Sequence, residues 1–225
     1  MRSLLVSILL LSVFTLQLSG QTTLGVKAQT GNAWLTFPDG FVIEAYDFRI
    51  PHWGYSIEVF RQLSPKLALG VAPGYVRRGS EREIGFINGF GPRFRAQLYL
   101  NYVELPFYLK FKQRLGGRFS TFAQTGAGLS YLTGGYREVE TFNVGNPPPN
   151  ENRPFDFEGV DENINRLDFG WYSSIGFSYR LGPGEVAISA DYYHGFVDFN
   201  PFEPLKNRTW AVGLGYAFRL GKKEG

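Results

Sequence analysis

The chain contains no cysteine, one methionine and only two histidines among its 225 residues. Without cysteine it can carry neither a disulfide framework nor a thiol-linked lipid anchor, and two lone histidines offer no evident zinc site. No internal apolar run reaches the roughly 18 residues of a membrane helix. These absences exclude a disulfide scaffold, a lipoprotein and a helical membrane protein. We expect no cofactor and no bound metal.

Aromatic residues and glycine are plentiful: aromatics make up 17% of the chain, and glycine occurs 28 times. Residues 208–220 show how they are arranged, because successive side chains of a strand point to opposite faces. One face carries the bulky residues Trp210, Val212, Leu214, Tyr216, Phe218 and Leu220, and the other carries small residues with the single charge of Arg219. A narrow membrane barrel shows its bulk to lipid and fills its lumen with small and polar groups.

Residues 1–20 have the composition of a secretory signal, with a charge at Arg2, an apolar stretch at 4–18 and small residues at Ser19 and Gly20. The alternative is an uncleaved anchor helix, but the stretch is short and lies at the extreme N-terminus. We expect cleavage before Gln21, which leaves residues 21–225 as a single domain. The formal net charge of +3 comes from basic residues scattered along the sequence, so we expect no nucleic-acid partner for an exported chain.

The period-two pattern recurs along the chain. Strand-like segments cover residues 22–30, 54–63, 66–76, 95–112, 118–132, 167–181, 185–195 and 208–220. Tight turns at 64–65, 115–117 and 182–184 alternate with long connections at 31–53, 77–94, 133–166 and 196–207. Outer-membrane barrels have short periplasmic turns and long extracellular loops. We therefore predict an all-β fold, an eight-stranded antiparallel up-and-down transmembrane β-barrel with that topology.

A soluble, lipocalin-like barrel is the alternative fold. It would need an apolar inner face around a ligand and a charged outer face, whereas the small face here is rich in Gly, Ala and Ser and poor in charge. An eight-stranded barrel has room inside only for side chains or one small ligand. We expect a closed polar lumen in the outer membrane of a Gram-negative bacterium, reached by export through the Sec pathway.

The segment YVELPFYLKFK at residues 102–112 places charges in an otherwise apolar strand. Its odd-numbered residues would face lipid, which leaves Glu104 and Lys110 in the lumen, where buried charges need partners. We predict a structural charge network along the barrel axis, formed by Glu58, Glu104, Lys110, Arg180, Asp191 and Arg219. A proton or ion path is the functional alternative. Pro106 cannot donate a ladder hydrogen bond, so we expect it at a bulge or an unpaired position.

The same segment resembles the Y-[LV]-E-[IL]-P-x-x-L-K signature of the PorT-like outer-membrane β-barrel family of Bacteroidetes. The likeness extends to residues 25–27, to LGVAPGYVRRG at 69–79 and to GAGLSY at 126–131. The resemblance implies a β-barrel fold and a location in the outer membrane. Most members of the family have no assigned activity, and the founding member is linked to protein secretion across the outer membrane. A terminal Phe, common in such barrels, is replaced by Phe218 followed by Arg219, Leu220 and a polar tail.

The expected function is therefore a non-enzymatic, monomeric structural or interaction component of the envelope. Its expected surroundings are outer-membrane lipid or lipopolysaccharide, and its expected partners are envelope or secretion-machinery proteins. The enzymatic alternative is a lipid A deacylase or acyltransferase built on His194. No serine follows His194 at the next position of the same face, and His52 falls in a predicted loop, so we expect no catalytic residue.

The long loops offer a second alternative, a carbohydrate- or adhesion-binding surface. Its aromatic residues would be Trp34, Phe37, Phe41 and Tyr46. An acidic cluster in the longest loop could hold Ca²⁺, but it lacks the spacing and the glycine of an EF-hand, so a solvated loop is expected. The cluster consists of Asp156, Glu158, Asp161 and Glu162.

Overall fold

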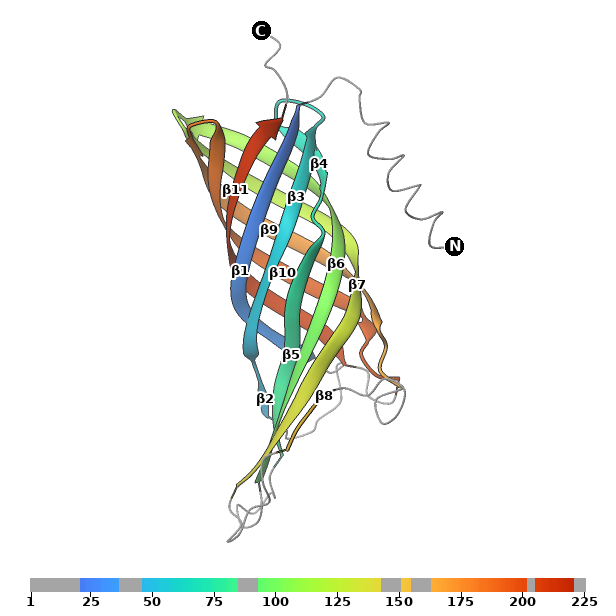
Figure 1. Ribbon diagram of the computed structural model, residues 1–225. Helices are drawn as coiled ribbons and strands as arrows, with labels where there is room; N and C mark the ends of the chain where they lie inside the picture. Colours follow the sequence, from blue (N-terminus) through green and yellow to red (C-terminus); the bar gives the residue numbers. More distant parts are fainter. Residues whose placement is uncertain are drawn as a thin grey trace, which may run out of the picture.

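The computed structural model describes residues 21–36, 46–84, 93–142, 151–154, 163–201 and 205–220. These residues form strands and their connections, and none of the described segments is a helix long and apolar enough to cross a bilayer. The strands are β1 (Thr22–Thr36), β2 (Tyr46–Phe48), β3 (Ile50–Gln62), β4 (Leu67–Val71), β5 (Gly74–Ile84), β6 (Arg93–Gly116), β7 (Phe119–Phe142), β8 (Glu151–Pro154), β9 (Leu167–Leu181), β10 (Gly184–Asp198) and β11 (Lys206–Leu220), as Figure 1 shows.

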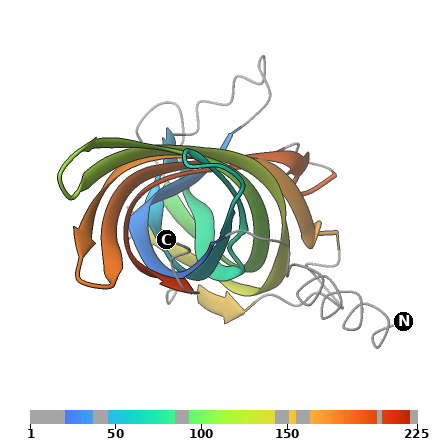
Figure 2. The ribbon, with the colours of Figure 1, turned by 90° about the horizontal axis from the view of Figure 1, so that it is seen from above.

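The sheet closes on itself, because β1 pairs antiparallel with both β3 and β11. Val26 of β1 lies opposite Ile57 on one side and Tyr216 on the other. Strands β4 and β5 follow one another along a single position of the ring, so the closed order is β1, β3, β4 with β5, β6, β7, β9, β10 and β11 (Figure 2). The predicted eight-stranded antiparallel up-and-down barrel is confirmed.

The two ends of the barrel differ in their connections. Residues 63–66, 117–118 and 182–183 make the short turns, at the end where β1 begins and β11 ends (Figure 1). Gly117 and Gly182 have φ values of 54° and 57°, a left-handed backbone that glycine adopts without strain. The other end carries the long connections. We call these two ends the turn end and the loop end.

The apolar side chains of the strands face outward. Ile175, Leu214 and Val26 are 66%, 61% and 60% exposed, whereas Thr209 and Ala211, on the inner face of β11, are 4% and 2% exposed. Exposed large hydrophobic residues occur at all eight positions of the ring. An apolar outside around small or polar inner residues suits a barrel surrounded by lipid.

Pro106 lies where the neighbouring strand is interrupted. Strand β4 ends at Val71 and β5 begins at Gly74, so the ladder to β6 is broken around Pro73. Across this break the amide of Ala72 donates to the carbonyl of Pro106 (3.1 Å). The two prolines share one gap in the ladder, which confirms the prediction that Pro106 occupies a locally unpaired position.

Several strands are longer than the sequence predicts. The segments predicted at 95–112 and 118–132 are the strands β6 and β7, which run to 24 residues each, against 15 in β9, β10 and β11. Much of the predicted loops 77–94 and 133–166 is therefore strand, flanked by β2 on β5 and by β8 on β7. The bulky-out, small-in pattern of the barrel wall is absent there because the outward residues, such as Glu81, Arg95 and Glu138, are mostly charged, while apolar residues such as Leu98 face inward.

Close approach of two backbones explains one lumen-facing glycine. A Cβ atom at Gly126 of β7 would lie 1.8 Å from the carbonyl oxygen of Phe107 in β6, while one at Gly134 would meet no atom within 4 Å. We expect Gly126→Ala to lower the free energy of unfolding by about 1–3 kcal/mol through overpacking. Gly134→Ala is the matched control and should change it little. Equal denaturant midpoints for the two variants in detergent micelles would contradict this packing.

Candidate functional site

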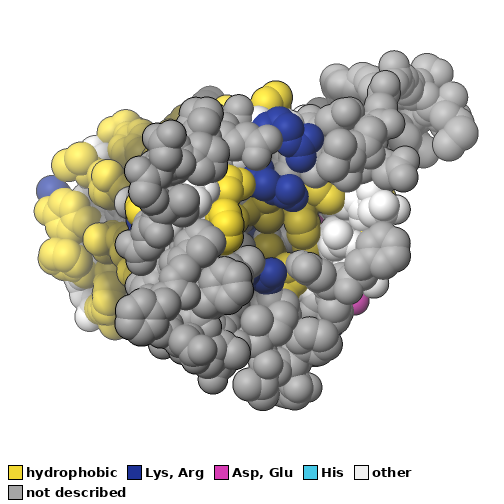
Figure 3. Space-filling model, turned by 90° about the horizontal axis from the view of Figure 1, so that it is seen from below, with side chains coloured by type: hydrophobic (Ala, Val, Ile, Leu, Met, Phe, Trp, Pro, Cys, Tyr) yellow, Lys and Arg dark blue, Asp and Glu magenta, His cyan; other side chains and the backbone are white. Residues whose placement is uncertain are grey.

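The lumen is closed at the loop end by buried apolar side chains, which we call the loop-end plug. They come from β1, β5, β6 and β7 and from the connections at 163–166 and 199–205: Leu35, Val76, Leu100, Tyr102, Leu132, Ile164, Phe199 and Leu205. In the view onto this end, hydrophobic side chains cover the left flank of the wall, and hydrophobic as well as Lys and Arg side chains are visible near the centre (Figure 3). A packed apolar layer across the lumen excludes water and ions from this side.

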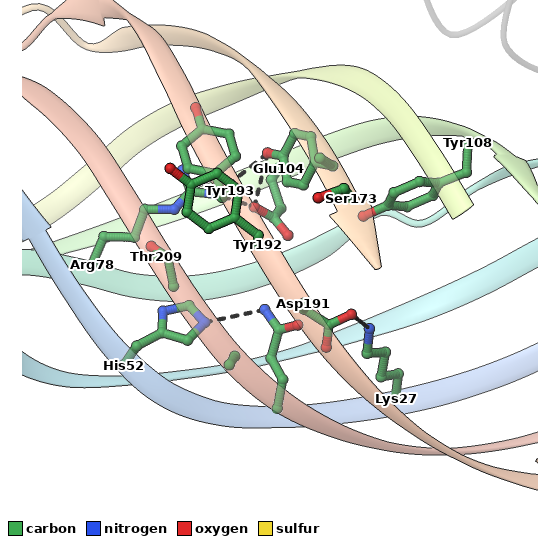
Figure 4. Close-up of a pocket in the computed structure, with 13 residues that line it drawn as sticks. Lys27, His52, Arg78, Glu104, Tyr108, Ser173, Asp191, Tyr192, Tyr193 and Thr209 are labelled. Carbon is green, nitrogen blue, oxygen red and sulfur yellow. Dashed lines mark hydrogen bonds and ion pairs between the residues drawn. The ribbon is translucent and has the colours of Figure 1, made fainter. Parts of the chain in front are cut away.

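On the turn-end side of the plug, Arg78 of β5 is 2% exposed and lies among polar and aromatic groups. Its Nη2 lies 2.5 Å from Oε2 of Glu104, and its Nη1 donates to Ser130 (3.1 Å). Tyr172 donates to the same carboxylate oxygen (3.1 Å), and the ring centroid of Tyr193 lies 3.7 Å from the guanidinium carbon (Figure 4). The charge of this Arg78–Glu104 cluster is thus compensated in place, which a buried ion pair requires.

A second pair joins β1 to β10 over Gly213, on the inner face of β11. Nζ of Lys27 donates to Oδ1 of Asp191 (2.7 Å), and Ser189 donates to Oδ2 of the same carboxylate (3.0 Å). Nearby, Nδ1 of His52 lies 2.6 Å from a carbonyl oxygen and must donate to it, so its Nε2 accepts from Gln29 (3.2 Å), as Figure 4 shows. The prediction that His52 lies in a loop is wrong: it is buried in β3.

The six residues predicted to form one charge network do not pair with one another. Glu104 pairs with Arg78, and Asp191 pairs with Lys27; neither cation was predicted as a lumen residue from the sequence. The period-two pattern would have placed both cations in the lumen, because Lys27 shares its strand face with Gly25, and Arg78 shares its face with the buried Val76. The remaining four, Glu58, Lys110, Arg180 and Arg219, all line a cavity at the turn end.

This cavity, the turn-end vestibule, has a volume of about 590 Å³. Its lining includes two carboxylates, Glu58 and Glu185, and seven basic residues, namely Lys66, Lys110, Lys112, Arg114, Arg118, Arg180 and Arg219. Lys112 forms an ion pair with Glu185. Nζ of Lys110 lies 4.5 Å and 4.3 Å from the ring centroids of Phe60 and Phe122, a cation–π arrangement.

The outer face of β5, β6 and β7 changes character towards the loop end. Arg77 lies over the rings of Trp53, Tyr99 and Tyr136 at 5.1–5.6 Å, and the two tyrosines stack at 4.5 Å. Beyond this aromatic layer most outward residues are polar and linked across strands, with Gln97 donating to Glu81 (2.6 Å) and Arg95 pairing with Glu81 (3.2 Å). The exception is Phe142, whose ring lies under the guanidinium of Arg95 (5.3 Å). We call this polar extension, formed by residues 79–84, 93–99 and 136–142, the loop-end ledge.

The predicted loop-binding residues are only partly described. Trp34 lies in β1 with the guanidinium of Arg49 over its ring (5.0 Å), and the backbone of Tyr46 pairs with Glu83 in β2 and β5. Phe37 and Phe41 lie outside the described residues, as do Asp156, Glu158, Asp161 and Glu162. Within the described ranges no group of three His, Cys, Asp or Glu residues could hold a metal.

His194 lies on the outer face of β10, between the rings of Tyr192 (6.3 Å) and Phe196 (5.3 Å). Its ladder neighbours are Trp171 on β9 and Arg208 on β11. None of these four flanking groups is a serine, a threonine or an acidic residue. The surroundings of His194 are those of an aromatic, outward-facing strand position.

Residues 19–200 match the outer membrane protein beta-barrel domain family. Similar solved structures include OprG from Pseudomonas aeruginosa, with 8% identity, 91% of this chain and 97% of that chain covered and a TM-score of 0.48. Another is Neisserial surface protein A, with 13% identity, 88% and 97% covered and a TM-score of 0.43.

Ail, the attachment invasion locus protein of Yersinia pestis, solved with the heparin analogue sucrose octasulfate, has 15% identity, 89% and 100% covered and a TM-score of 0.40. No curated protein matches the chain. At such low identities and TM-scores nothing about function is transferred from these structures. The family match, in contrast, spans most of the chain, and it agrees with the closed ring and its apolar outer wall. The chain belongs to the outer membrane protein beta-barrel domain family.

Proposed function

We propose that this outer-membrane barrel is a non-enzymatic, monomeric interaction component of the cell envelope, with the loop-end ledge as its extracellular contact surface. The observation that carries the proposal is the closed lumen. The loop-end plug, the Arg78–Glu104 cluster and the Lys27–Asp191 pair fill the inside of the barrel between the loop end and the turn-end vestibule. A barrel of eight strands without a channel does not act as a porin.

The ledge supports the contact role. It extends β5, β6 and β7 past the aromatic layer at Arg77, so it stands in water while the rest of the outer wall faces lipid. Its side chains are held by cross-strand bonds such as that between Arg95 and Glu81, which makes it a rigid polar surface. Rigid surfaces lose little conformational entropy on binding.

The finer assignment to the PorT-like branch of Bacteroidetes, and with it an accessory role in protein secretion, belongs to this proposal and rests on the YVELPFYLK signature. That segment forms the middle of β6, where Glu104 and Lys110 face the lumen and Pro106 meets the break between β4 and β5. The outward, aromatic setting of His194 gives no support to a lipid-modifying enzyme.

Site-specific photo-crosslinking in native membranes tests the contact surface. A photoreactive residue at Glu138, on the ledge, should yield discrete protein adducts, because this position faces water beside Gln97. The matched position is Leu214, on the lipid-facing wall of β11, which should yield none. Adducts with secretion proteins would support the secretion role. Absence of protein adducts at Glu138, or equal adducts at both positions, would overturn the proposal.

A further inference from the structure

Basic residues that lie far apart in the sequence converge on the turn-end vestibule. Its seven basic and two acidic lining residues leave a formal excess of five positive charges. The whole chain has a net charge of only +3, so the remainder is negative by two. The positive charge of this protein is therefore concentrated at the turn end of the barrel, around the mouth of the vestibule.

Most of these charges have no counter-ion within the protein. Lys112 is paired with Glu185, but no ion pair among the described residues involves Lys66, Arg180 or Arg219. Lys110 sits deepest, between Phe60 and Phe122, and in the described part of the chain its Nζ meets rings and no carboxylate oxygen at ion-pair distance. A partly buried ammonium without a counter-ion is costly, so an external anion would stabilise it.

The geometry also restricts where that anion comes from. On the loop-end side of the vestibule, the Lys27–Asp191 pair and the Arg78–Glu104 cluster fill the lumen, so the anion enters from the periplasm. The headgroups of the inner leaflet lie outside the barrel wall, whereas Lys110 lies inside it, in contact with lumen-facing rings. A volume of about 590 Å³ falls within the roughly 300–1,000 Å³ of small-molecule sites.

We propose that the turn-end vestibule binds a soluble periplasmic small molecule that carries two or more phosphate or carboxylate groups. Lys110 at the floor supplies a point charge for one anionic group. Arg180 and Arg219 at the exposed rim supply forked donors for a second, since a guanidinium matches phosphate and carboxylate oxygens with paired hydrogen bonds. Two anionic groups on one molecule span floor and rim, which a single anion does not.

Calorimetric titration of the full-length barrel in non-ionic detergent micelles at low salt tests this site. Tripolyphosphate and citrate are the probes for the phosphate and carboxylate classes, and orthophosphate and acetate are their single-group counterparts. We expect at least one of the two probes to bind at one molecule per barrel, at least tenfold more tightly than its counterpart. The double variant Arg180→Gln/Arg219→Gln should weaken this binding at least tenfold.

Lys206→Gln is the matched control, because it removes a cation at the opposite end of β11, beside Asp198. It should leave the affinity unchanged. Failure of both probes to bind, or equal loss in the rim variant and the control, would overturn the proposal. Displacement of the bound probe by anionic phospholipid or by an acidic peptide at lower concentration than by either free probe would overturn it too, in favour of a lipid or protein ligand.

Lys110→Met separates binding from folding. It removes the floor charge but keeps an unbranched side chain between the two phenyl rings. We expect at least a tenfold loss of affinity together with an unchanged or higher temperature of conversion to the unfolded band on a detergent gel. A variant that is folded and still binds the probe as tightly as the parent would refute the role of Lys110.

Discussion

Glu104→Ala is expected to lower the free energy of unfolding by about 3–5 kcal/mol, the cost of leaving a buried charge without its partner. The guanidinium of Arg78 is 2% exposed and has this carboxylate as its ion-pair partner. Ser130 and the Tyr193 ring remain after the substitution, but neither carries a negative charge. Denaturant titration in lipid vesicles, followed by tryptophan fluorescence, measures the change.

The control removes both charges at once. Arg78→Met/Glu104→Leu leaves no isolated ion, and replacing a buried pair by apolar side chains of similar size is often neutral. We therefore expect the double variant to recover most of the stability that Glu104→Ala loses. A double variant as unstable as the single one would show that hydrogen bonds to Tyr172 and Ser130 matter more than the charge balance.

Leu214→Arg is expected to cost about 2–4 kcal/mol, because it places a charge near the middle of the lipid-facing wall. Leu214 lies near the centre of the outward apolar series of β11 that runs from Trp210 to Leu220, and it is 61% exposed. A water-soluble barrel would gain solubility from the same substitution. Folding yield into vesicles and the denaturant midpoint of the folded fraction report the effect.

Thr133→Arg is the matched control. Thr133 is exposed at the bulge of β7, level with Asn101, where the outer face changes from apolar to polar. At this depth a new arginine should cost about 0–1 kcal/mol. Similar losses at the two positions would mean that the wall at Leu214 does not lie in the hydrocarbon region, and the lipid-facing assignment would fail.

Part of the candidate site follows from local pattern and part does not. Period two places Glu104, Lys110 and Asp191 in the lumen, and a missing amide donor places Pro106 at a break in the ladder. The period-two pattern does not give the position of a residue along the barrel axis, so the predicted charge network did not include Arg78, the ion-pair partner of Glu104. The register of β5 on β6 puts Leu100, not Glu104, opposite Arg78, and the long Arg78 side chain spans this offset inside the lumen to reach the carboxylate.

The same limit applies to the loop-end ledge and to the turn-end vestibule. The ledge leaves the lipid, so its strands no longer show bulky residues outward and small residues inward, and residues 79–84 and 136–142 were predicted as loops, whereas 95–99 were predicted as strand. The cations of the vestibule come from the β3–β4 and β6–β7 turns and from β6, β9 and β11, and they look scattered in the chain. Only the closure of the ring brings Lys66, Arg180 and Arg219 to one mouth.

The sequence by itself determined the class of fold, the lipid-facing wall and the alternation of short and long connections, because each depends on residues adjacent in the chain. The tertiary structure decided which charges meet, where the lumen is sealed and where it stays open. Those outcomes depend on strand stagger and tilt, which are set by the closure of the whole ring. Arg219 illustrates both contributions. It shares the inner strand face with Ala217, which follows from the sequence, and the closed ring makes it part of a basic vestibule.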